Sequence, residues 1–403
     1  MRTRLLVPAL AIIVGVPCTA GQEITSLHPD PRTGSARAAV VKDVPLVHTA
    51  QILPLDADVR VASPDDVAGQ AERVIALFKR VLESSGSHLD RLVRVNVYAT
   101  HRDHLPVVRE VLSRTLAGRP ILPAVTWSVT PLPRKGAAVA MDGVAVAAHA
   151  VGDTVRRRRI DGVPEMCGPT HVALLPAGTA VYISGMAGKG DMAAATRSAM
   201  GQLAGTMRGL GLSRDDVVHV KTFLRPMSDV EAATREIVSY FGEQAPPPIT
   251  HFGWTLADPI EIELVVAGKG LSVPSDGPGG VQYYNPPGAQ ASPYFSRVAI
   301  VRGGPRIFTG SVVSGGADDV QADVRGMFRE LESLLREAGS DLKHMVKATY
   351  FVGNDEASGA LSRVRGELYD PRRPPAASKA GVEDTAFEGR ASVVDMIAVP
   401  GAR

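Results

Sequence analysis

The spacing of apolar residues along the first third of the chain predicts a helix, a strand and a second helix. Apolar residues recur at helical spacing between 71 and 86, and Gly86 ends this helix. Ser63-Pro64-Asp65-Asp66 begins it with a cap, an early proline and acidic residues. Residues 93–98 then alternate apolar and polar positions, which is typical of a half-buried strand. A helix over about 103–116 and strands near 125–130 and 139–146 complete the pattern.

This order of elements recurs three times. The sequences LDRLVRVNVYATHRDHLPVVREVL, RDDVVHVKTFLRPMSDVEAATREIV and DLKHMVKATYFVGNDEASGALSRV share one pattern, in which Val93, Val218 and Val346 occupy matching places. Apolar hairpins, HVALLPAGTAVYISG and RVAIVRGGPRIFTG, open the second and third segments. We therefore predict an α+β fold of three tandem β-β-α-β-α-β-β units, over residues 41–150, 151–275 and 276–403.

Each predicted unit is one sheet with two helices on one face, so its other face needs a covering partner. Three such sheets in one chain can cover each other, whereas separate units would leave large apolar patches in water. The repeats thus predict that a single chain folds as an intramolecular pseudo-trimer and stays monomeric.

The N-terminus has the features of a secretory signal. A basic start, an apolar run over residues 5–16 and small residues at 18–20 predict a signal peptide over 1–20, followed by a flexible lead-in over 21–40. An uncleaved anchor and an ordinary N-terminal segment are the alternatives. Export predicts a periplasmic or secreted protein without membrane attachment after cleavage, in which Cys167 is the one remaining thiol.

Composition and charge exclude several classes of protein. The net charge of +2 gives no general attraction to nucleic acid, and two cysteines cannot build a disulfide scaffold or a Cys-based zinc site. His101 and His104 lack a third metal ligand, and no glycine motif has dinucleotide or Walker spacing, so we expect neither metal nor cofactor. The run Arg156–Arg159 is interpreted as a solvated linker, with anion or RNA binding as the alternative.

The repeated pattern resembles the reactive intermediate deaminase family of the RidA or YjgF type, whose subunits have a chorismate-mutase-like sheet. NPPGAQASPYFSRVAIVRGGPRIFTGSV in the third unit is similar to the family's opening, and EIELVVAG in the second unit to its closing strand. The first unit departs most, with VPLVHTAQILPLD at the opening. Family members are homotrimers with ligand clefts between subunits, so the resemblance implies three unequal clefts within this chain. It also implies a small-molecule ligand, namely an imine, an enamine or a related carbonyl compound.

The resemblance implies hydrolysis of enamines and imines, which uses an arginine for the substrate carboxylate and a glutamate for proton transfer. The matching arginine positions read Val125, Ile249 and Ala377, so all three units lack it. The glutamate position reads Ala140, Glu261 and Val393, so the second unit alone keeps the acid. The opening tyrosine is Tyr294 in the third unit and Thr170 in the second.

Strand periodicity suggests substitutes for the lost groups. Residues two positions further along a strand face the same side, and these are Trp127, His251 and Lys379. His251 with Glu261 is the candidate acid–base pair, and Lys379 could hold a carboxylate. Structural roles remain open for each of them, as does a nucleophilic role for Cys167 with His171 or His251. Glu263, Asp142 and Asp395 recur at one closing-strand position, which indicates a structural role.

Three functions are therefore compatible with the sequence. The first is a secreted hydrolase or deaminase acting on small enamines or imines, with Glu261 and His251 as catalytic residues and Lys379, Tyr294, Trp127 and Thr170 as substrate-binding residues. The second is a non-catalytic pseudo-trimer that binds a small metabolite or a partner. The third is a chorismatase-like hydrolase on the same scaffold.

Overall fold

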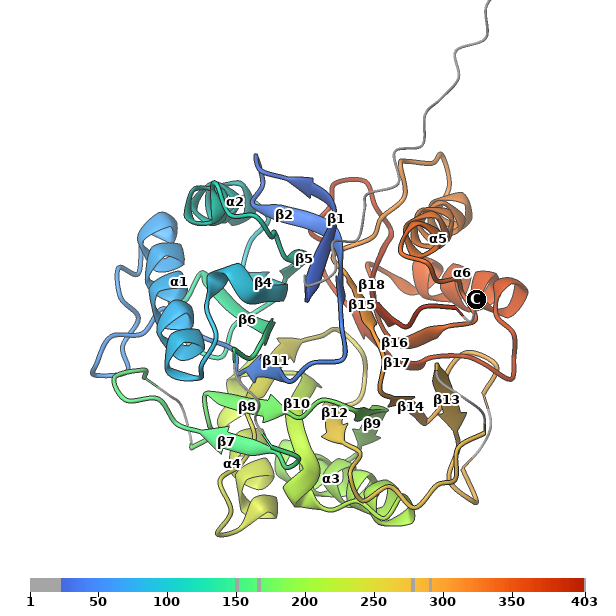
Figure 1. Ribbon diagram of the computed structural model, residues 1–403. Coiled ribbons are helices and arrows are strands. Elements are labelled where there is room, and N and C mark those ends of the chain that lie inside the picture. The colour runs from blue at the N-terminus through green and yellow to red at the C-terminus, as the bar shows by residue number, and fades with distance from the viewer. Residues whose placement is uncertain (1–22, 149–151, 165–167, 277–279, 290–291, 402–403) are drawn as a thin grey trace, which may run out of the picture.

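Three successive segments of the chain adopt one order of elements in the computed structural model, which describes residues 23–148, 152–164, 168–276, 280–289 and 292–401 (Figure 1). The first unit consists of β1 (Ile24–Asp30), β2 (Ser35–Val41), β3 (Leu46–Thr49), α1 (Val67–Ser84), β4 (Leu92–Ala99), α2 (His104–Leu116), β5 (Ala124–Val129) and β6 (Val139–Val146). The second consists of β7 (Arg156–Arg158), β8 (Val172–Leu175), β9 (Thr179–Gly188), α3 (Met192–Gly209), β10 (Val217–Leu224), α4 (Val230–Phe241), β11 (Ile249–Gly253) and β12 (Ile260–Ala267). The third consists of β13 (Val281–Tyr284), β14 (Val298–Arg302), β15 (Arg306–Thr309), α5 (Val320–Glu337), β16 (Met345–Val352), α6 (Asp355–Leu368), β17 (Ala376–Gly381) and β18 (Ser392–Ala398).

The predicted α+β class and the tandem organisation are confirmed, but each unit has one more strand at its start than the pattern predicted. The prediction of a flexible lead-in over 21–40 is wrong for the described residues, because β1 and β2 form an antiparallel hairpin. Ala38, Ala39 and Val41 of β2 are fully buried. Small alanines give a weak strand signal, so pairing with neighbouring strands, rather than local preference, decides this segment.

Strand pairing between neighbouring units links the three units in a closed ring. The strand β8 of the second unit pairs with β3 of the first, and β14 of the third unit pairs with β9 of the second. The ring closes where β2 of the first unit pairs with β15 of the third. Each unit therefore pairs with a strand of each neighbour, which covers strand edges that would otherwise invite aggregation. The strands β7, β11, β13 and β17 stay at the ends of the two sheets.

The helices lie on the outside of this ring, one pair for each unit (Figure 1). Separate apolar clusters fill the space between each sheet and its helices, and a further cluster contains residues of all three units. The sheet faces that carry no helices thus cover each other at the centre, as the repeats predicted. No helix among the described residues is long and apolar enough to cross a bilayer.

The first helix of each unit begins at an aspartate cap. The side chains of Asp66, Asp191 and Asp319 accept hydrogen bonds from the backbone three residues later, at 3.0, 2.8 and 2.7 Å. The first helix therefore starts at Val67, a few residues after the predicted Ser63 cap. An aspartate at this position satisfies one of the free N–H groups of each helix end.

The arginine run includes the short strand β7, in which Arg157 is half-buried while Arg156, Arg158 and Arg159 are exposed. Arg157 donates to the carbonyl oxygens of Val217 and Ala245 at 2.8 and 2.9 Å and lies over the ring of Phe241. Arg158 donates to Ser84 at the end of α1, at 2.8 Å. Burial lowers the pKa of Arg157 to about 10, which leaves it charged at neutral pH.

Candidate functional site

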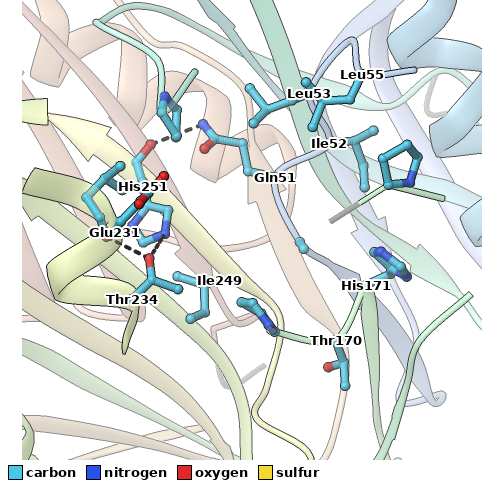
Figure 2. A pocket seen from close by; sticks show the side chains of 15 residues that line it. Gln51, Ile52, Leu53, Leu55, Thr170, His171, Glu231, Thr234, Ile249 and His251 are labelled. Carbon is cyan, nitrogen blue, oxygen red and sulfur yellow. Dashed lines mark hydrogen bonds between the residues drawn. The ribbon is translucent and has the colours of Figure 1, made fainter. Parts of the chain in front are cut away.

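A pocket opens at the junction of the first and second units (Figure 2). The empty space between its lining residues, with the open mouth included, is about 610 Å³. Gln51, Ile52, Leu53 and Leu55 come from the loop after β3, whereas β11 and the start of α4 form the opposite wall. The remaining lining residues include Thr170 and His171, which precede β8.

His251 lines this pocket but both of its ring nitrogens already have partners. Thr234 donates its hydroxyl hydrogen to the Val230 carbonyl at 2.8 Å, so it accepts from Nε2 of His251 at 3.1 Å. Nδ1 then accepts from the Thr222 hydroxyl at 2.8 Å. Burial lowers the pKa of His251 to about 4. These contacts fix a neutral, fully bonded imidazole, which is a poor general base.

His171 lies in the same pocket with one nitrogen unused. The backbone N–H of Ile160 donates to its Nδ1 at 2.8 Å, so the ring hydrogen is on Nε2. Nε2 is buried and has no hydrogen-bond partner among the described residues. Burial, together with the charge of Arg159, lowers the pKa of His171 to about 4. The pocket therefore holds a neutral, buried N–H donor. The sequence indicated His171 only as a possible partner of Cys167, which lies outside the described residues.

No lysine or arginine is among the described residues that line the pocket. Pro133, Val230, Ile249 and the leucines make most of its wall apolar. Thr170, the predicted substrate-binding residue, lines the pocket, and its hydroxyl donates to the Pro246 carbonyl at 2.8 Å. A ligand carboxylate would find no cation among these lining residues.

The residues at the three substitute positions lie at equivalent places but differ in their contacts. Strand register places Trp127, His251 and Lys379 opposite Val97, Thr222 and Tyr350. Each side chain meets a helix of its own unit: Arg109 of α2 lies 4.9 Å over Trp127, and Lys379 donates to Ser358 of α6 at 2.7 Å. The pocket described above is thus one of three equivalent junctions.

The other two junctions contain larger side chains. Trp127 is buried, and its backbone N–H donates to Ser311 of the third unit at 2.9 Å. At the junction of the second and third units, the Arg365 guanidinium lies 5.2 Å over Tyr294. Burial and the nearby Arg365 lower the pKa of Lys379. Tyr294 and Lys379 therefore lie near each other around Arg365, apart from Thr170 and His251.

Glu261 and His251 do not form the predicted pair. His251 aligns with Thr222 of β10, and Glu261 aligns with the next residue, Phe223. Since adjacent strand residues point to opposite faces, His251 faces helix α4 and Glu261 faces the inside of the ring. The prediction of a His251–Glu261 acid–base pair is therefore wrong: β10 lies between the two strands and the side chains leave the sheet in opposite directions.

Glu261 lies where the second unit meets the third. Burial, reinforced by the neighbouring Glu263, raises its pKa to about 7, and its Oε1 has no hydrogen-bond partner among the described residues. Gly185 leaves room for this carboxyl, because a Cβ there would lie 1.9 Å from Oε1. Glu261 is therefore a carboxyl that changes charge near neutral pH.

The recurring acids Asp142, Glu263 and Asp395 line a second cavity, which is bordered by all three units. Each has different partners. The Asp142 carboxylate accepts hydrogen bonds from the side chains of Asn96, Tyr98 and Thr250, at 2.6, 2.6 and 2.8 Å. The other two acids pair with cations: Glu263 with Lys347 at 2.7 Å and Asp395 with Arg94 at 2.5 Å.

The ion pairs of the central cavity could not be predicted from the sequences of the single strands. Arg94 and Lys347 are polar positions of β4 and β16, and nothing in the local sequence shows that they meet acids of other units. Among the described residues, no group of three His, Cys, Asp or Glu side chains could hold a metal ion.

Comparison with known proteins identifies the family. The profile of the Endoribonuclease L-PSP family matches residues 30–147 and 289–399, which is more than half of the chain. The chain therefore belongs to the Endoribonuclease L-PSP family, the family of the RidA and YjgF proteins. The second unit lies between the matched regions, and its strand pairing follows that of the other two.

Individual relatives match parts of the chain. Protein DfrA of Myxococcus xanthus is 37% identical over 94 residues, which are 23% of this chain and 70% of that protein. The structure of the Rid-family protein YyfB of Yersinia pestis covers 31% of this chain and 99% of its own, with 17% identity and a TM-score of 0.29. A YjgF-family structure from Neisseria meningitidis covers 30% of this chain and 97% of its own, with 16% identity and a TM-score of 0.24.

Proposed function

We propose that this protein binds an uncharged small molecule in the pocket between the first and second units and does not deaminate imino acids there. The observation that carries the proposal is the pocket lining, whose described residues include neither lysine nor arginine. A carboxylate leaving water for this apolar wall would lose its hydration without gaining an ion pair. The bonded state of His251 supports the same conclusion, because its neutral ring has no free nitrogen to accept a proton.

Binding can be tested with a library of uncharged metabolites in thermal-shift measurements. A ligand that binds the folded state alone raises the melting temperature as its concentration exceeds the dissociation constant. The Gln51→Trp variant is the matched control, since Gln51 lines the pocket and the indole would occupy it. We expect shifts in the native protein that this variant abolishes. Shifts that survive in the variant, or none with any neutral compound, would contradict the proposal.

Catalysis is tested in parallel by measuring ammonia release from 2-aminoacrylate-type imines. We expect no release above the uncatalysed rate, because the pocket offers no cation for the substrate carboxylate. Single-stranded RNA is a second substrate to include, in view of the family's description, and we expect no cleavage, because phosphates would also lack a cationic partner.

A second candidate function is hydrolysis of an imine, an enamine or a related carbonyl compound beside Glu261. The favouring observation is the unbonded Oε1 of a carboxyl whose pKa is raised to about 7, because a general acid–base group works best near the ambient pH. Turnover that is lost in Glu261→Gln and retained in Gln51→Trp would assign catalysis to this junction. Turnover unaffected by Glu261→Gln would exclude it.

We also propose that the protein is exported and that its first 20 residues are removed as a signal peptide. The proposal is supported by the basic start, the apolar run and the small residues before Gly21. N-terminal sequencing of protein recovered from the periplasm or medium tests it. A mature chain that starts near residue 21 is expected, and a cell-retained chain that starts at Met1 would contradict export.

A further inference from the structure

The pocket between the first and second units contains a buried hydrogen-bond donor, Nε2 of His171, that has no partner among the described residues. A buried donor of this kind costs free energy unless a ligand or water accepts from it. His171 is 4% exposed, so bulk solvent does not satisfy this nitrogen. The donor therefore marks a place where a bound molecule would present an acceptor atom.

The orientation of this donor is fixed by the chain. The Ile160 N–H donates to Nδ1 at 2.8 Å, and the backbone N–H of His171 donates to the Arg158 carbonyl at 3.0 Å. The His171 carbonyl in turn accepts from the Ala50 N–H at 2.8 Å. The imidazole is thus held between the two units, with its hydrogen on Nε2. A neutral donor held in this way discriminates by hydrogen bonding rather than by charge.

The surroundings of His171 complete the description of the ligand. Figure 2 shows His171 and Ile52 on one side of the pocket, with Ile249, Thr234 and His251 on the other. The walls are mostly apolar, the polar groups of His251 and Thr170 are already bonded, and the described lining has no cation. The one carboxylate of the described lining, the exposed Glu231, pairs with Arg235 at 3.8 Å. An apolar body would fill the walls, and an uncharged acceptor would meet Nε2.

We propose that the ligand is an uncharged carbonyl compound, such as a ketone, ester, lactone or amide with an apolar body, and that His171 Nε2–H donates to its carbonyl oxygen. This inference rests on the proposed function and narrows it. It also separates this site from one for imino acids, since the group recognised is a neutral oxygen in place of a carboxylate.

The test uses three probes that share one ring: cyclohexanone, cyclohexanecarboxylate and cyclohexylammonium. Ligand-observed saturation-transfer NMR at pH 7.5 gives their dissociation constants for the native protein and for His171→Phe, His171→Gln and Gln51→Trp. His101→Phe is the matched control, because His101 is exposed and is not among the residues that line the pocket. Thermal melting of each variant shows whether it folds.

Cyclohexanone should bind at least about tenfold more tightly than either charged probe, and His171→Phe should weaken it about tenfold, as expected for losing one buried hydrogen bond. His171→Gln should restore part of the affinity, because its amide can donate. Equal binding of the carboxylate, or unchanged cyclohexanone binding in folded His171→Phe, would overturn the inference. If both His171 variants fail to fold, the order of the three probes on the native protein decides.

The outcomes also separate this inference from the proposed function. Probes that bind in the native protein and are lost in Gln51→Trp, but without preference for the ketone, leave a binding pocket and reject the carbonyl assignment. Probes that do not bind the native protein at all, or that bind Gln51→Trp equally well, reject both.

Discussion

Arg94 of the first unit and Asp395 of the third form a buried ion pair, with Nη2 and Oδ2 2.5 Å apart. Burial by itself would raise the pKa of Asp395, but Arg94 and then Lys221 outweigh it and hold the pKa below its ordinary value. The guanidinium also donates to Thr126 at 3.0 Å. This pair joins the first and third units at the central cavity. The two residues can have opposite charges because the units differ in sequence.

Removing one partner of this pair should be strongly destabilising. Asp395→Ala leaves the Arg94 charge buried without compensation, which we expect to lower the free energy of unfolding by about 3–5 kcal/mol. Urea unfolding at pH 7 measures the loss. The control is Asp58→Ala, which breaks the exposed pair with Arg60 and should cost less than about 1 kcal/mol. Similar losses in the two variants would show that the central pair has no special role.

Three buried histidines should make the protein sensitive to mild acid. Burial lowers the pKa of His48 to about 3 and those of His171 and His251 to about 4. Between these values and 6.5 the unfolded chain binds more protons than the folded one, so stability falls as the pH falls below 6.5. At pH 5 each histidine should cost roughly 2 kcal/mol relative to pH 7.5. The midpoints of urea unfolding between pH 5 and pH 7.5 test this prediction. The His251→Gln variant should show a weaker dependence of the midpoint on pH.

Glu261 should have the opposite dependence on pH. Its pKa is raised to about 7 by burial, so the folded state holds a proton that the unfolded state has lost, and stability falls as the pH rises from about 4.5 to 7. Glu261→Gln removes this cost and should stabilise the protein at pH 8 by roughly 1–3 kcal/mol. Thermal melting at pH 5 and pH 8 measures the difference.

The control for this change is Glu231→Gln, at an exposed position on the rim of the pocket, where no gain is expected. A Glu261→Gln variant that is less stable than the native protein at pH 8 would show that the ionised carboxylate makes a favourable contact.

The N-terminal hairpin should be required for the ring to close. A chain beginning at residue 23 keeps β1 and β2, whereas one beginning at residue 42 exposes the edge of β15 that β2 covers. We expect the shorter chain to aggregate or to associate through this edge, because an uncovered strand readily pairs with another chain. Size-exclusion chromatography and circular dichroism compare the two. A monomeric, folded chain that starts at residue 42 would contradict this.

The regular elements followed from the sequence because their patterns are local. Alternation over 93–98 and helical spacing over 71–86 were sufficient to predict β4 and α1, and the recurrence of this pattern predicted tandem units. β2 was missed because its buried residues are mostly alanines, whose preference for strands is low. Its place depends on β15, more than 260 residues away.

The candidate site was predicted in part. His251 and Thr170 were selected from their strand and loop positions, and both line the pocket. The pairing of His251 with Glu261 failed because two residues on matching strands can leave the sheet on opposite faces, and the register across β10 decides this. The role of His171 could not be predicted from the sequence, because it depends on the contact with Ile160 that fixes the ring hydrogen on Nε2.

The sequence by itself therefore determined the elements and their tandem order, since both depend on residue type and short-range spacing. The tertiary structure decided which strands of different units pair, which acids meet cations at the centre and which residues line the pocket between the first and second units. These outcomes depend on contacts between units far apart in the chain, where register and side-chain volume, rather than local preference, set the free energy.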